Sequence, residues 1–105
     1  MAVDMSGVNV YPHFDRITLS GTAPNATEIV LPNGPLLFSV RPITNAGRVA
    51  SSGSDDGALS DDYLTIAADT TLQVQISARA DRSPVMYIAS GTASTVVEVV
   101  LERPA

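Results

Sequence analysis

Residues 71–77 read TLQVQIS, and this stretch of the sequence indicates the fold class. Leu72, Val74 and Ile76 occupy every second position, and the residues between them are polar. Successive side chains of a β-strand point to opposite faces, so this spacing predicts a strand with one buried and one solvated face. Helical periodicity is nearly absent from the rest of the chain, which indicates an all-β protein.

Similar short runs recur at roughly ten-residue spacing, separated by Gly, Pro, Asn and Asp. We predict seven strands, with residues 48–51 as a candidate for an eighth: 17–20, 28–31, 36–41, 63–66, 71–77, 85–90 and 94–102. A parallel sheet would need crossover helices of about ten residues or more, and no segment is suited to form one. The sequence therefore predicts a single small antiparallel β-sandwich of the jelly-roll or immunoglobulin-like type.

A chain of 105 residues is long enough for one domain. Residues 1–15 lack clean alternation, so we expect them to form an extended N-terminal arm, with the β-sandwich over residues 16–105. Within the sandwich, residues 51–62 read SSGSDDGALSDD and are expected to form one long irregular loop.

The composition excludes several kinds of functional site. The chain has no Cys, which excludes disulfides, thiol nucleophiles and cysteine-ligated metals, and His13 is its single histidine. Six basic residues, all Arg, stand against eleven acidic ones, so the net charge of -5 disfavours binding to nucleic acid. We find no secretory signal and no membrane span, and we expect a protein that stays soluble in the cytoplasm or is assembled there.

An acidic cluster in the 51–62 loop is the remaining candidate for metal binding. Asp55, Asp56, Asp61 and Asp62 would offer carboxylate oxygens to a hard cation such as Ca²⁺. Their spacing does not match the EF-hand pattern, and a solvated acidic loop is the simpler interpretation. We predict no catalytic residue, no metal site and no cofactor, and we leave open whether this loop binds a cation.

The last strands are apolar on both faces. Val96 and Val100 lie on the face opposite Val97, Val99 and Leu101, and residues 85–89 read VMYIA. Either these strands are central and covered twice, or their outer face meets another chain, because an antiparallel sheet normally has polar residues on its wet face. We favour contact with another chain, since a small domain has little material for a third layer.

Aromatic residues near the N-terminus add to this surface. Tyr11 and Phe14 lie in the expected arm, where they would be exposed to a partner or anchor the arm to the sandwich. Exposed aromatics also stack on sugars, so a glycan-binding module is an alternative. The predicted interface residues are Tyr11, Phe14, Met86, Val96 and Val100.

Three segments carry a resemblance to a known group of proteins. They are LLFSVRPITNAGRVASSGSDDGA at 36–58, YLTIAADTTLQVQI at 63–76 and SPVMYIASGTASTVVEVVLE at 83–102. In this order they resemble small β-sandwich virion structural proteins of tailed bacteriophages, of the capsid decoration or cement type. The segments are strand patterns and contain no catalytic signature.

The resemblance implies a protein of the virion surface that binds the major capsid protein and has no chemistry of its own. It also implies a homo-oligomer, with a trimer as the first expectation. The arm at residues 1–15 lies outside the resemblance, and we expect it to lie across an adjacent subunit and add contact area. A head–tail connector or tail component of the same sandwich class is the alternative position in the virion.

Overall fold

The computed structural model describes residues 2–19, 25–77 and 83–104, and it shows an all-β protein. The strands are β1 (Val3–Asp4), β2 (His13–Thr18), β3 (Thr27–Val30), β4 (Leu36–Pro42), β5 (Gly47–Ala50), β6 (Leu64–Ile66), β7 (Leu72–Ile76), β8 (Val85–Ala89) and β9 (Val96–Glu102). None of the residues that the structure describes belongs to a helix able to cross a lipid bilayer.

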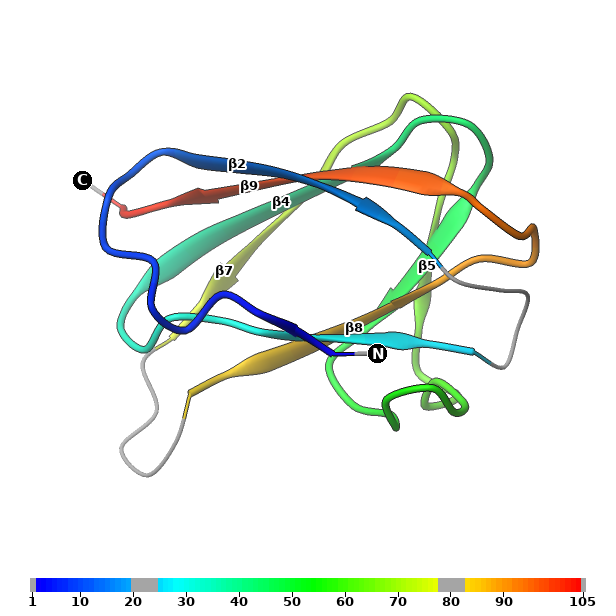
Figure 1. Ribbon diagram of the computed structural model, residues 1–105, viewed down its shortest axis with the longest axis horizontal. Helices are drawn as coiled ribbons and strands as arrows, with labels where there is room; N and C mark the ends of the chain where they lie inside the picture. The colour runs from blue at the N-terminus through cyan, green and yellow to red at the C-terminus, as the bar shows by residue number, and fades with distance from the viewer. Residues whose placement is uncertain (1, 20–24, 78–82, 105) are drawn as a thin grey trace.

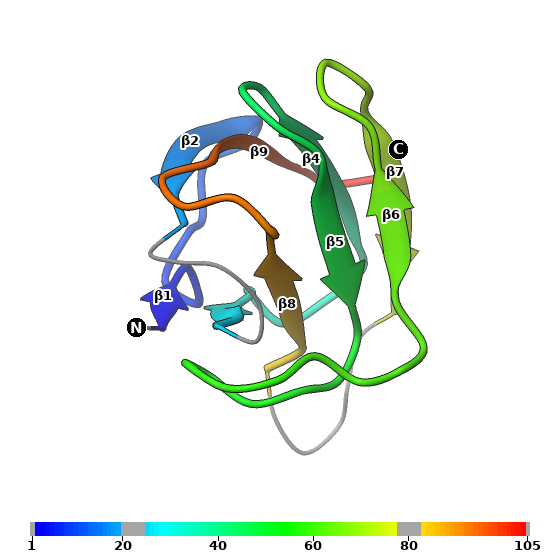
Figure 2. The same ribbon diagram turned by 90° about the vertical axis from the view of Figure 1, so that its right-hand side faces the viewer.

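Two sheets pack face to face as a β-sandwich (Figures 1 and 2). The five-stranded sheet has the order β1-β3-β8-β5-β6, and the four-stranded sheet has the order β2-β9-β4-β7. All pairings are antiparallel except that of β1 with β3. Apart from the β5–β6 connection, each step along the chain passes from one sheet to the other. The predicted all-β sandwich is therefore confirmed, with one parallel pair at an edge.

The eight strands expected from the sequence are present, and β2 shows the largest difference. It begins at His13 rather than at residue 17, and position 20, the expected last residue, lies outside the described residues. In β2 the inward positions opposite β9 carry His13, Asp15 and Ile17. Polar inward residues are a common feature of edge strands, and here they hide the alternation from sequence inspection.

The core lies between the sheets and is built from their inward rows. Phe38 of β4 is fully buried, between Leu101 of β9 and Val74 of β7. Ile29 and Ile88 contribute from the five-stranded sheet and are at most 1% exposed. Each such side chain stabilises the fold by about 1.5–3 kcal/mol through burial. Because the apolar rows face inward, the alternate positions of the same strands form the outer faces.

The outer face of β8 is covered by the chain's own 51–62 loop. Tyr87 and Ala89 point outward from the sandwich, yet they are buried beneath Ala26 and Leu59. The loop is held there by backbone hydrogen bonds between Ala26 and Gly57 and between Asp56 and Ala26, each 2.8 Å long. For β8 the expectation of a covering partner chain is therefore wrong, because the third layer comes from within the molecule.

The N-terminal residues belong to the sandwich, so the expectation of an extended arm over 1–15, outside a sandwich of 16–105, is also wrong for its described part. β1 pairs with β3, and the Met5 N–H donates to the Val30 carbonyl at 2.7 Å. The Met5 side chain is only 3% exposed, within the main core. This segment lacks alternation because β1 is only two residues long, too short to show a period of two.

Candidate functional site

The outer face of the four-stranded sheet brings together three of the five predicted interface residues. This open face consists of outward side chains from β2, β4 and β9: Phe14, Arg16, Leu37, Ser39, Arg41, Val96, Glu98 and Val100. No described segment crosses it in the way that the 51–62 loop crosses the other sheet (Figures 1 and 2). The open face is therefore the main candidate for a functional surface.

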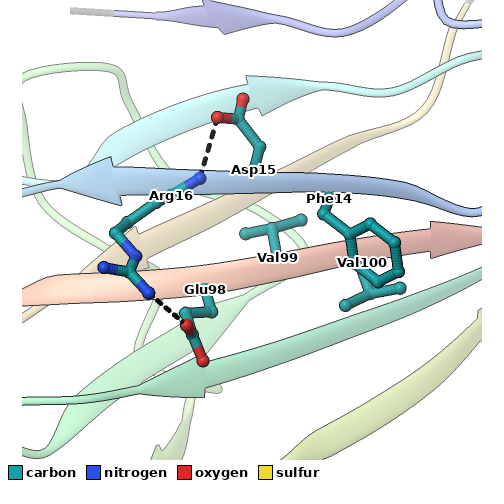
Figure 3. Close-up of a pocket in the computed structure, with 6 residues that line it drawn as sticks. All are labelled: Phe14, Asp15, Arg16, Glu98, Val99 and Val100. Atoms are coloured by element: carbon teal, nitrogen blue, oxygen red, sulfur yellow. Dashed lines mark hydrogen bonds and ion pairs between the residues drawn. The ribbon is translucent and has the colours of Figure 1, made fainter.

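Phe14 is the most prominent side chain of the open face. It is 71% exposed, whereas burial is usual for an aromatic ring of this size. The strand register places it directly opposite Val100, which is half-buried, and Figure 3 shows the two side chains next to each other. Together they form an apolar patch on a regular sheet.

Charged side chains form the next row across the same strands. The Arg16 guanidinium donates to the Glu98 carboxylate at 2.6 Å (Figure 3). Arg41 lies opposite Glu98 on the other side of β9 and is 3.6 Å from the Asp69 carboxylate. Exposed pairs of this kind contribute at most about 1 kcal/mol to stability. Their main effect is to orient two guanidinium groups at the border of the apolar patch.

An open hollow of about 470 Å³ lies between the apolar patch and the charged row. Its lining comes from adjacent residues of β2 and β9: Phe14, Asp15, Arg16, Glu98, Val99 and Val100 (Figure 3). Asp15 points away from the open face, and its carboxylate accepts the Arg16 N–H at 2.8 Å. The hollow thus offers an apolar wall and paired opposite charges, which suits a protein side chain as the occupant.

The other predicted interface residues have different positions. Val96 lies on the open face beyond Glu98, opposite Thr18, and is half-buried. Met86 is 7% exposed in the core, so its assignment to an interface is wrong. The inward row of β8 contains Met86 and Ile88, and sequence inspection could not tell which row of an all-apolar strand faces inward.

Tyr11 lies away from the open face and has a structural role. Its ring stacks under the Arg103 guanidinium at 4.7 Å, and its hydroxyl donates to the Val8 carbonyl at 2.9 Å. Arg103 also donates to the Pro35 carbonyl at 2.6 Å and to the Asn33 carbonyl at 3.1 Å. Tyr11 therefore helps to join the N-terminal segment to the 32–35 turn and the end of β9, as the anchoring interpretation expected.

The acidic 51–62 loop covers the outer face of β8. The Asp55 carboxylate accepts the Glu28 N–H at 3.0 Å, and this hydrogen bond lowers the pKa of Asp55 from its ordinary value. Among the residues that the structure describes, no group of three or more His, Asp or Glu side chains is arranged to hold a metal ion.

A second, polar hollow of about 320 Å³ lies beside this loop. Glu28 and Tyr87 line it, with the Tyr87 hydroxyl donating to the Glu28 carboxylate at 2.7 Å. Tyr87 is 8% exposed, and the Tyr63 ring is covered by the Arg48 guanidinium at 5.0 Å. The buried Tyr87 ring therefore has no free face to stack on a sugar, whereas Tyr63 remains 40% exposed.

The sequence analysis missed the ion pair of the open face. Arg16 and Glu98 are 82 positions apart, and only the β2–β9 pairing brings them together. The signal that was available is Glu98 itself, a single charge among the outward valines of β9.

A comparison of the chain with protein-family models, curated proteins and solved structures finds no match.

Proposed function

We propose that this protein is a non-enzymatic structural protein of a tailed-phage virion, which binds the assembled capsid and stabilises it. The observation that carries the proposal is the open face, where the exposed Phe14 ring and Val100 lie beside the Arg16–Glu98 pair. The resemblance of residues 36–58, 63–76 and 83–102 to decoration proteins supports the major capsid protein as the partner in this proposal.

The composition of the open face suits a protein partner. Energetically important interface residues are most often aromatic residues and Arg, surrounded by contacts that exclude water. Phe14 would act as the apolar anchor, and Arg16 and Arg41 would pair with carboxylates or carbonyls around it. The face is part of a hydrogen-bonded sheet, so little ordering cost is expected on binding.

Modest affinity at each copy is sufficient for this role. Burying Phe14 would contribute roughly 1.5–3 kcal/mol. Copies bound to neighbouring capsid subunits, or to one another in an oligomer, act together and gain affinity through multivalency. The sequence-based expectation of a trimer stays a prediction, as does the virion surface as the location.

Binding to capsids that lack this protein tests the proposal. We expect Phe14→Ala to weaken co-sedimentation with such capsids by roughly 10- to 100-fold, the loss that corresponds to the buried area of the ring. Val10→Ala is the matched control, because Val10 is 74% exposed but lies outside the open face. Equal binding of the two variants would contradict the assignment of the open face.

A second variant probes the same face with charge. Val96→Glu combined with Val100→Glu should disrupt shell contacts and leave the fold intact, because both side chains are on the outward row of β9.

The number of copies in each particle separates a decoration protein from a head–tail connector or tail component. Hundreds of copies per particle support decoration, whereas a single ring of copies supports a connector or tail component.

A further inference from the structure

We propose that β7 is a dimerisation edge, at which two copies of this chain pair antiparallel about a twofold axis. Their four-stranded sheets would then form one continuous sheet. This inference does not rest on the proposed function, because it concerns an edge of the sheet and not the open face. It predicts a dimer where the resemblance implies a trimer, so the oligomeric state in solution decides between the two.

β7 lies at the end of the four-stranded sheet. It pairs with β4 over Leu72–Ile76, and no other strand of the described residues pairs with its second side. Figure 2 shows β7 and β6 together at the same side of the sandwich. An edge strand presents a row of backbone N–H and C=O groups to which another strand can add.

The other edge strands are less suited to pairing. β1 has two residues and β6 has three, so either would offer few hydrogen bonds. β2 is longer but carries Asp15 and Arg16, and charged residues are a usual protection against edge pairing. Residues 71–77 contain no charged residue, no Pro and no Gly. Among the edges of the described residues, β7 alone combines length with the absence of such protection.

The core-facing row of β7 is incompletely covered. Leu72, Val74 and Ile76 are each only half-buried, in contrast to the fully buried inward rows of β4 and β9. A hollow of about 370 Å³ lies between β6 and the start of β7, where Leu72 is its lining residue from this row and Leu64 of β6 is 60% exposed. A strand paired to the free side of β7 would shield this apolar row from water.

The sequence of β7 fits a second copy of itself. LQVQI has the same pattern of apolar and Gln positions in both directions, with Val74 at its centre. Antiparallel strands related by a twofold axis perpendicular to the sheet would place Val74 opposite Val74 of the other copy. In the same register Leu72 lies opposite Ile76, and Gln73 lies opposite Gln75. A shift by one residue is disfavoured, because it would place Gln side chains on the core side.

The distribution of charge also supports a second copy of the chain as the partner of β7. The chain has a net charge of -5, so two copies repel each other over most of their surfaces. Residues 71–77 are uncharged, and contact at β7 therefore brings no like charges directly together. Self-complementary contact of one surface with itself is also the usual form of a closed dimer.

Sedimentation equilibrium of the full chain over a concentration series tests the proposal. We expect a reversible monomer–dimer equilibrium for the wild type. Gln73→Lys with Gln75→Lys places two pairs of ammonium groups opposite each other and should raise the dissociation constant about tenfold. These changes reduce the net negative charge, so a general charge effect would act in the opposite direction.

Gln73→Glu with Gln75→Lys is the matched control. In the proposed register it places opposite charges across the axis, and it should form the dimer at least as well as the wild type. Both double variants change the same two exposed side chains, and both replace the Gln73 amide that donates to Ser39, so their folds should respond alike. Circular dichroism checks that the folds agree.

Three results would overturn the proposal: a monomer at all concentrations up to about 1 mM, a trimer, or a dimer equally stable in both double variants. Hydrogen exchange gives an independent measurement. Amide protection in β7 should rise with protein concentration in the wild type, whereas protection in β2 should not.

Discussion

The structure makes Met5 part of the core, and replacing it separates a packed N-terminal segment from a free arm. Met5→Ala removes most of a side chain that is 3% exposed among the buried residues of both sheets. Truncating a buried Met to Ala costs about 2–5 kcal/mol in lost burial and cavity formation. We expect a value near the lower end, about 2–3 kcal/mol, because Met5 lies beside the two-residue edge strand β1, where the chain can relax.

This loss is large compared with the stability of a small domain, which is about 5–15 kcal/mol. For a domain of this size it corresponds to a decrease in Tm of roughly 10–20 °C. Urea unfolding followed by circular dichroism measures the change in free energy directly. The slope of the transition should stay constant if the native state keeps its compactness.

Val10→Ala is the matched control, because it shortens an apolar side chain of the same segment that is 74% exposed. We expect its effect to stay below about 0.5 kcal/mol. If Met5→Ala and Val10→Ala unfold at the same urea concentration, residues 1–15 do not contribute to the core. The prediction of an extended arm outside the sandwich would then be restored.

Two further predictions concern the loop and the turn at the ends of the strands. The pKa of Asp55 is lower in the folded protein than in the unfolded chain, because the Asp55 carboxylate accepts the Glu28 N–H. This hydrogen bond stabilises the fold at pH values above the unfolded pKa, and that stabilisation is lost as the pH falls through the folded pKa. Urea unfolding should therefore show a smaller loss of stability between pH 7 and pH 3 for Asp55→Asn than for the wild type, and equal losses would exclude this role. Gly34→Ala should destabilise the fold by about 1–3 kcal/mol, because Gly34 has a φ of +113° and a Cβ there would lie 2.8 Å from Nη1 of Arg103. Gly91→Ala, where a Cβ would meet no atom within 4 Å, should change the Tm little, and similar values for both glycine variants would count against strain at the turn.

Most strands could be predicted from the sequence because their alternation is complete. In β9, Val97, Val99 and Leu101 are apolar and buried, and Glu98 between them is on the outer face. β2 could not be located fully because its inward residues His13 and Asp15 are polar. β1 is too short to have a pattern.

The candidate site was predicted in part, for a related reason. Phe14 and Val100 were named as interface residues, and both lie on the open face. Met86 was named with them, but it lies in the core. All five residues of β8 are apolar, so only the position of the second sheet and of the 51–62 loop determines what covers each row.

The sequence by itself determined the all-β class, most strand positions and the inward-facing row of most alternating strands. These are local properties, because a period of two residues follows from the geometry of a single strand. The tertiary structure alone decided which strands are neighbours, and through them the pairing of Arg16 with Glu98 and the placement of β7 at an edge. Neighbours are settled by packing between segments far apart in the chain, which no local pattern encodes. For the same reason, the 51–62 loop could be recognised in the sequence, but not the sheet face that it covers.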